Sequence, residues 1–331
     1  PGALVDLEYT VQILQYLYAR DSSSLKTPRI HVALEELTRA GILSDRELDD
    51  IIEAYHFFRK LINGLRMLRG SADDLFLPPV NSDEYLHLAR RMGYESAGGI
   101  TPAQKLSLDF RTTTATIRRF VEHYLGRDWI PEENTGNAAD LVLSDSIPSK
   151  LRNSIFSSAG FFDSRRAYVN IKALAGEGRR RQLFARLSVL AWDVLAQSPA
   201  PDMALNNWER FEHSIADIEK HYEELLQQPK RLELLLQVFA SSQFLADILI
   251  KYPEFYNWVT DPTRIKTLRR REDMANDLKL ETAQVKNAAE LGRIIRKFRK
   301  REILRIATRD ICLLVSDRKS TRLNSSHYRT S

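Results

Sequence analysis

The chain has 331 residues, of which 28% are charged, a formal net charge of +5 at pH 7 and a single cysteine, Cys312. This length is sufficient for two domains that each bury a core. The sequence contains no run of about 18 apolar residues, which excludes a membrane-spanning helix, and one cysteine excludes an internal disulfide framework. No secretory signal is recognised, so a reducing cytoplasm is the expected location.

Glycine and proline are scarce, with 13 and 12 residues, and helix-forming residues are abundant, which predicts a mostly α fold of helical bundles. The stretch 2–9 is an exception, because its alternating polar and apolar residues predict a short strand that leads into a helix over 10–19. In such a strand Asp6 and Glu8 share one face, where two carboxylates can hold a divalent metal ion. The competing interpretation is that they orient the join between strand and helix.

Apolar side chains at helical spacing predict a helical bundle over 10–127. Its longest helix is expected to begin at a capping box formed by Ser44 and Glu47 and to end at Gly70. Several glycine, asparagine and proline residues then predict a linker and domain boundary over 128–150. A second helical region is expected over 151–312.

Two basic runs have two interpretations each. Arg179–Arg181 could contact phosphate, but a solvated helix start is the preferred interpretation. The segment 296–309 holds seven Arg or Lys residues and could bind nucleic acid or a membrane surface. Its apolar residues keep a core-facing stripe, so a solvated helix face is again preferred.

Several segments resemble the glutamine synthetase adenylyltransferases, and they occur in the order found in that family. The opening Gly-Ala-Leu-Val-Asp-Leu-Glu-Tyr resembles the segment that closes a nucleotidyltransferase domain of these enzymes, although Ala3 and Tyr9 replace the family's Gly and Phe. The other matching segments are 54–62, 65–70, 88–94, 204–211, 234–249 and 296–310. The likeness therefore covers residues 2 to about 312 in pieces.

The resemblance implies a parent enzyme that uses ATP and Mg²⁺ to attach AMP to a tyrosine of glutamine synthetase and removes it by phosphorolysis. This reaction would regulate nitrogen assimilation, with a nitrogen-signalling regulatory protein as a second partner. Residues 1–9 would be the terminal strand of a truncated α/β nucleotidyltransferase domain. Glu8 and Asp6 would lie at the edge of its missing active site, as candidate catalytic residues.

The superfamily's main metal-binding pattern, a Gly-Ser turn followed by Asp-x-Asp, does not occur in the sequence, and neither do common phosphate-loop or hydrolase motifs. The chain itself is therefore expected to be an inactive fragment, with no cofactor-binding residue assigned. The alternative is a helical protein-interaction module without catalytic activity. A nucleic-acid-binding protein is a third, weaker interpretation. Residues 317–331 resemble a translated sequencing adapter and are expected to be a non-native tail.

Overall fold

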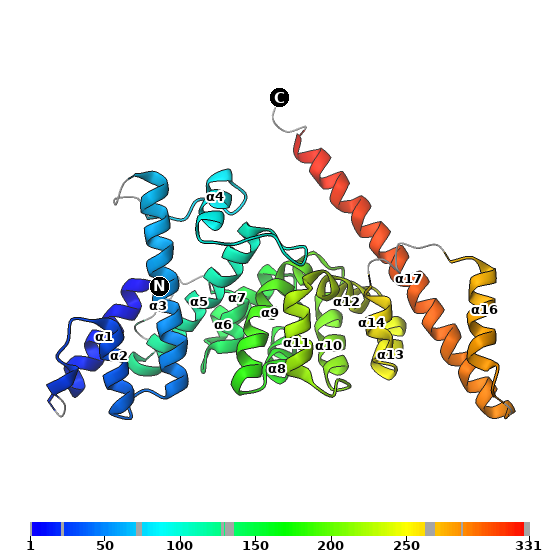
Figure 1. Cartoon of the computed structure of the whole chain (residues 1–331), viewed down its shortest axis with the longest axis horizontal. Coiled ribbons are helices and arrows are strands. Elements are labelled where there is room, and N and C mark those ends of the chain that lie inside the picture. The colour runs from blue at the N-terminus through cyan, green and yellow to red at the C-terminus, as the bar shows by residue number, and fades with distance from the viewer. Residues whose placement is uncertain are drawn as a thin grey trace. The chain divides into compact units, whose positions relative to one another are not determined.

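The chain folds into helices throughout the part that the structure describes. The computed structural model describes residues 2–20, 23–70, 75–126, 129, 136–261, 269–285 and 287–327, with side chains as far as residue 311. Within these ranges the regular elements are helices, and the remaining β pairing is an isolated bridge between Ala97 and Ile100. The predicted mostly α fold is confirmed (Figure 1).

The chain divides into two compact units. The first comprises Pro1–Asp193 and Tyr222–Pro229, and the second comprises Val194–His221 and Lys230–Ser331. None of the described helices combines the length and the apolar composition that a bilayer-spanning segment needs.

The first unit is built around one long helix, α5. This helix packs against α1, α3, α4 and α6, while α2 packs against both α1 and α3. Figure 1 shows α1, α2 and α3 side by side. The elements of this half are α1 (Leu4–Tyr18), η1 (Ser23–Leu25), α2 (Ile30–Arg39), α3 (Asp45–Arg69), α4 (Asp83–Arg91) and α5 (Pro102–Leu125).

Sequence signals at the ends of α3 correctly located this helix. The hydroxyl oxygen of Ser44 accepts from the backbone N–H of Glu47 at 3.3 Å, and the Glu47 carboxylate accepts from the backbone N–H of Ser44 at 3.0 Å. Gly70 ends the helix with a left-handed φ of 67°, which glycine adopts without steric strain. The capping box and the glycine stop are therefore both confirmed.

The predicted N-terminal strand is wrong, because these residues begin α1. Leu4, Leu7 and Val11 are buried at helical spacing, whereas Val5 and Tyr9 are 58% and 61% exposed. The alternation of polar and apolar residues was real, but the same residues also follow a helical period. With the helix packed on α2, α3 and α5, the helical period determines which side chains are buried.

The region of the predicted linker also contains a helix. Residues 127–128 and 130–135 of this region lie outside the described residues, but α6 (Ala138–Leu143) is buried along its whole length and packs against α5 and α8. The first unit continues through α7 (Ser149–Ser158), α8 (Ser164–Ala175) and most of α9 (Gly178–Gln197). The first unit thus extends past residue 150, and the domain boundary over 128–150 stays a prediction.

The second unit has its own apolar core. Within it α10 packs against α13, while α17 packs against α13, α14 and α16. Its core includes Trp208, Phe211 and Phe239, each fully buried. The helices of this part are α10 (Pro201–Glu212), α11 (Ile218–Gln227, shared with the first unit), α12 (Pro229–Ser241), α13 (Gln243–Lys251), α14 (Phe255–Val259), α16 (Arg271–Thr282) and α17 (Ala288–His327).

The backbone of the predicted tail begins as helix. The last helix, α17, continues through His327, and residues 328–331 lie outside the described residues. The origin of this segment stays a prediction.

Candidate functional site

The two carboxylates singled out in the sequence do not share a face. Asp6 and Glu8 are two residues apart on α1, which places their side chains about 200° apart around the helix axis. The Asp6 carboxylate accepts from the backbone N–H groups of Gly2 and Ala3, at 2.7 and 3.0 Å. It therefore caps the start of α1, which is the orienting role considered for it in the sequence.

The turn before α1 lies directly on α5. Gly2 has a φ of +91°, and a Cβ atom added there would lie 2.6 Å from the carbonyl oxygen of Thr114 and 2.9 Å from Arg118 Cγ. Only glycine combines this backbone conformation with such a close approach. The start of α1 is thus fixed on the middle of α5 by a glycine contact and by the Asp6 cap.

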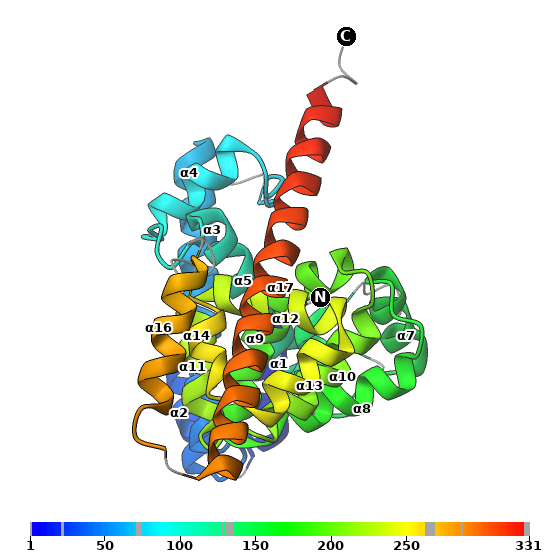
Figure 2. The same ribbon diagram turned by 90° about the vertical axis from the view of Figure 1, so that its right-hand side faces the viewer.

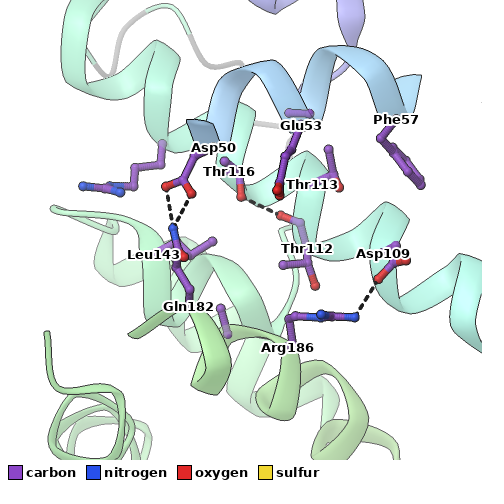
Figure 3. A pocket seen from close by; sticks show the side chains of 13 residues that line it. Asp50, Glu53, Phe57, Asp109, Thr112, Thr113, Thr116, Leu143, Gln182 and Arg186 are labelled. Atoms are coloured by element: carbon purple, nitrogen blue, oxygen red, sulfur yellow. Dashed lines mark hydrogen bonds and ion pairs between the residues drawn. The ribbon is translucent and has the colours of Figure 1, made fainter. Parts of the chain in front are cut away.

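A polar cavity of about 300 Å³ is lined by residues of α5 other than those that contact Gly2 (Figure 3). Three threonines of α5, Thr112, Thr113 and Thr116, form a ridge along one side of the cavity. Around this ridge stand carboxylates from α3 and polar side chains from α9. The remaining lining residues are Asp50, Glu53, Ala54, Phe57, Asp109, Arg119, Leu143, Gln182, Ala185 and Arg186.

Two polar links connect the walls of this cavity. The Gln182 amide donates to the Asp50 carboxylate at 2.5 Å, and Arg186 donates to Asp109 at 3.1 Å. Asp109 also accepts from the Tyr94 hydroxyl at 2.7 Å. Figure 3 shows the first two links at opposite sides of the threonine ridge.

Burial changes the acid–base properties of this region. It raises the pKa of Asp50 above the ordinary value, against the opposing effect of the Gln182 hydrogen bond. Burial also raises the pKa of Tyr94, and the hydrogen bond to the negatively charged Asp109 adds to this effect. The cavity thus offers hydroxyl, amide, carboxylate and guanidinium groups, which suit a small polar molecule.

The wall formed by α6 is held by buried ionic contacts. Arg118 forms two hydrogen bonds with Asp140, at 2.7 and 2.6 Å, and both side chains are less than a tenth exposed. Asp140 also accepts from the backbone N–H of Asn137 at 2.6 Å, which caps the helix. A bidentate guanidinium–carboxylate pair fixes orientation as well as distance.

Two cations satisfy the carbonyl groups at the C-terminal end of α6. Arg181 donates to the carbonyl oxygens of Val142 and Leu143, at 2.9 and 2.6 Å. Lys172 donates to those of Val142 and Ser144, at 3.2 and 3.0 Å. Burial, aided by the nearby Arg181, lowers the pKa of Lys172 to about 8. Positive charge here complements the negative end of the helix.

The arginine run at 179–181 is mostly structural. Arg180 donates to the carbonyl oxygens of Leu174 and Ala173 at the end of α8, at 2.9 and 2.8 Å. Arg181 holds α6, and Arg179 pairs with Glu223 at the surface. The run lies at the start of α9, as the preferred interpretation predicts, and two of its three arginines also bind carbonyl groups at helix ends.

In the second unit, the basic run of α17 lies partly against aromatic rings. Lys297 pairs with Glu254 at 2.8 Å, and Arg301 stands 5.3 Å from the centre of the Trp258 ring. Arg305 is buried and donates to Glu302 at 2.9 Å. Other members of the run, such as Arg296 and Arg299, are exposed as the solvated-face interpretation predicts.

One feature of the sequence, a run of threonines, indicates the position of the cavity. Threonine is a weak helix former, yet α5 carries Thr112, Thr113, Thr114 and Thr116 in its middle. Such a run favours a functional or packing reason for the hydroxyl groups. Among the described residues, no group of three or more His, Cys, Asp or Glu side chains could hold a metal ion.

Comparisons with known proteins match two different family models. Residues 1–125 match the model described as GlnD PII-uridylyltransferase. Residues 232–325 match the model described as glutamate-ammonia ligase adenylyltransferase. Both models describe enzymes that transfer a nucleotidyl group, and no solved structure matches the chain.

Curated relatives match nearly the whole chain. Bifunctional glutamine synthetase adenylyltransferase/adenylyl-removing enzymes from Corynebacterium diphtheriae and Cutibacterium acnes are 23% and 26% identical, over 95% and 94% of this chain. The enzyme of the same description from Bifidobacterium longum is 25% identical over 99% of it. The chain spans only 30–31% of the length of these relatives. The resemblance predicted from the sequence is confirmed, since the chain is similar to the glutamine synthetase adenylyltransferases over nearly its whole length.

Proposed function

We propose that this chain is a helical segment of an enzyme that adenylylates glutamine synthetase and removes the adenylyl group again. The observation that carries the proposal is that relatives with this printed description match 94–99% of the chain. The family-like segments also occur along the chain in family order. ATP and Mg²⁺ would be used by transferase domains of the whole enzyme. Its partners would be glutamine synthetase and a nitrogen-signalling protein, in the cytoplasm.

The segment itself is proposed to transfer no AMP, since its sequence lacks the Gly-Ser and Asp-x-Asp pattern that would hold the metal ions of nucleotidyl transfer. The test is to incubate the chain with glutamine synthetase, Mg²⁺ and ATP labelled in its α-phosphate. We expect no label on glutamine synthetase. Label above the level of a chain-free control would overturn this part of the proposal.

The proposal that the chain is part of a larger enzyme can be tested by sequencing the gene. Sequencing on both sides of this segment should find the Gly-Ser and Asp-x-Asp pattern in the same reading frame. An uninterrupted reading frame without this pattern would contradict the assignment. The chain would then be better explained as a helical interaction module.

Glu8 remains the better of the two candidates for the edge of a transferase site, because the Asp6 carboxylate is occupied as a helix cap. In the full-length enzyme, Glu8→Gln should lower adenylyl transfer or removal about 10- to 100-fold, as expected for a residue that supports metal ligands. The matched control is Glu95→Gln, which removes an exposed carboxylate of the same unit. Equal activity of the two variants would exclude Glu8 from the site.

A further inference from the structure

The helix α16 is held to its unit in an unusual way. Its 12 residues include none that is buried, and its packing partner is α17 (Figure 2). Leu280, one of its few large apolar side chains, is 76% exposed. A helix of this length is marginal by itself in water and normally depends on a buried apolar face. Hydrophobic burial therefore contributes little to the docking of α16.

Ion pairs take the place of apolar packing. Arg269, just before α16, pairs with Asp277 of α16 and with Glu302 of α17, the latter at 2.8 Å. At the other end of the helix, Glu281 pairs with Arg301 of α17 at 2.7 Å. Asp277 and Glu281 are four residues apart, so their side chains lie on the same face of α16. The ionic contacts thus involve one face of α16, from its middle to its last turn.

Glu281 also lines a cavity. A space of about 400 Å³ lies among α14, α16 and α17, and Glu281 is the part of its lining that comes from α16. The rest of the lining is aromatic, aliphatic and charged, with Phe255, Trp258, Phe298 and Arg301 among its members. Moving α16 away would expose these groups further to solvent.

We propose that α16 is a strap latched to α17 by ion pairs, which opens as ionic strength rises and then uncovers the aromatic and basic wall of this cavity. Screening weakens ion pairs near the surface, because the Debye length falls from about 10 Å at 0.1 M salt to about 3 Å at 1 M. Helices held by buried apolar side chains do not respond in this way. This behaviour is independent of the function proposed above.

Hydrogen–deuterium exchange of the whole chain tests the latch. Between about 0.05 and 0.5 M NaCl, we expect the amides of α16 to exchange about two- to fivefold faster, which corresponds to the loss of weak ion pairs. The amides of α10, whose inward side chains are fully buried, should keep their rates. An α16 rate that does not change with salt would overturn the proposal.

A pair of matched variants separates the latch from general helix stability. Glu281→Gln should speed exchange of α16 by a similar factor at low salt, and by more than Glu272→Gln on the same helix does. Glu272 is in the first turn, where a carboxylate stabilises the helix dipole, and Glu281 is in the last turn, where it opposes it. If the two substitutions acted only through the stability of the helix itself, Glu272→Gln would speed exchange more than Glu281→Gln. Faster exchange in Glu272→Gln than in Glu281→Gln would reject the latch.

Discussion

Gly2 shows how much a single position can determine at the junction of two helices. Its left-handed backbone and its approach to Thr114 exclude a side chain. The Asp6 carboxylate accepts from the backbone N–H groups of Gly2 and Ala3. The start of α1 consequently has one arrangement relative to α5. The sequence pattern of this stretch therefore records a packing requirement as well as a family resemblance.

The change Gly2→Ala should destabilise the first unit by about 1–3 kcal/mol, because it adds backbone strain and an atomic overlap. Gly41→Ala is the matched control: its φ is also positive, at +73°, but an added Cβ would meet nothing within 4 Å. Urea unfolding followed by circular dichroism measures both. If the two variants lose the same free energy of unfolding, the close contact with α5 has no energetic effect.

His221 is a buried base in an aromatic environment. Its ring lies 5.0 Å from the Tyr256 ring, and its Nε2 is 3.5 Å from the Glu212 carboxylate, which itself accepts from the Trp208 indole at 2.8 Å. Burial lowers the pKa of His221 to about 4, from an ordinary value of 6.5. The imidazole is therefore neutral in the folded protein at neutral pH.

This lowered pKa makes stability depend on pH. Below pH 6.5 the unfolded chain binds a proton at His221 that the folded chain does not bind until about pH 4, so stability is lost as the pH falls through this window. The loss between pH 7 and pH 4.5 should be about 2 kcal/mol. Urea unfolding should show a smaller loss for His221→Gln, and an unchanged one for the exposed His31→Gln. The same loss in all three proteins would contradict this role.

At the scale of elements, α6 is the clearest case of a helix maintained by its neighbours. It has six residues, too few to be stable alone, and it depends on a buried ion pair at one end and on two cations at the other. Such contacts come from residues far away in the chain. They explain why a region rich in turn-forming residues nevertheless contains a buried helix.

Arg181→Met should destabilise the first unit by about 2 kcal/mol, because it removes charged donors from two buried carbonyl groups. Arg179→Met, two positions earlier, removes an exposed pair with Glu223 and should change stability by less than about 1 kcal/mol. Urea unfolding gives the size of each effect, and hydrogen exchange of the α6 amides locates it. A larger effect of Arg179→Met would show that the carbonyl contacts of Arg181 are unimportant.

Local signals predicted the elements well where they acted within one helix. The Ser44–Glu47 capping box, the Gly70 stop and the apolar stripe of α3 all depend on residues a few positions apart, and all are found in the structure. The strand over 2–9 failed because its pattern fits two periods, and only packing against α5 selects one. The cavity of Figure 3 could not be predicted, since its walls come from helices more than 100 residues apart.

At the scale of the whole molecule, the charge of +5 is distributed so that many cations have internal partners. On α17, Lys297, Arg301 and Arg305 each pair with a carboxylate of the second unit. These three cations are therefore engaged within their own unit, while Arg296 and Arg299 are exposed. Three of the seven cations of the basic run thus stabilise the fold of their own unit.

Binding to DNA should accordingly be weak and should depend little on salt. With a fluorescent duplex of about 20 base pairs, we expect a slope of log K against log salt shallower than about −3, corresponding to few phosphate contacts. Fluorescence anisotropy at several salt concentrations gives this slope. A steep slope with tight binding at low salt would instead support the nucleic-acid interpretation of residues 296–309.

The first unit is discontinuous along the chain, and this affects the order in which it can be made. Tyr222 and its neighbours belong to this unit, where the Tyr222 hydroxyl donates to the Leu174 carbonyl oxygen at 3.0 Å and the ring lies against Phe184. A ribosome releases Val194–His221 before these residues emerge. The first unit must therefore wait, nearly complete, while a segment of the other unit passes out of the exit tunnel. Its last buried tyrosine arrives only afterwards, so pauses in translation after residue 193 would prolong the life of an unfinished bundle.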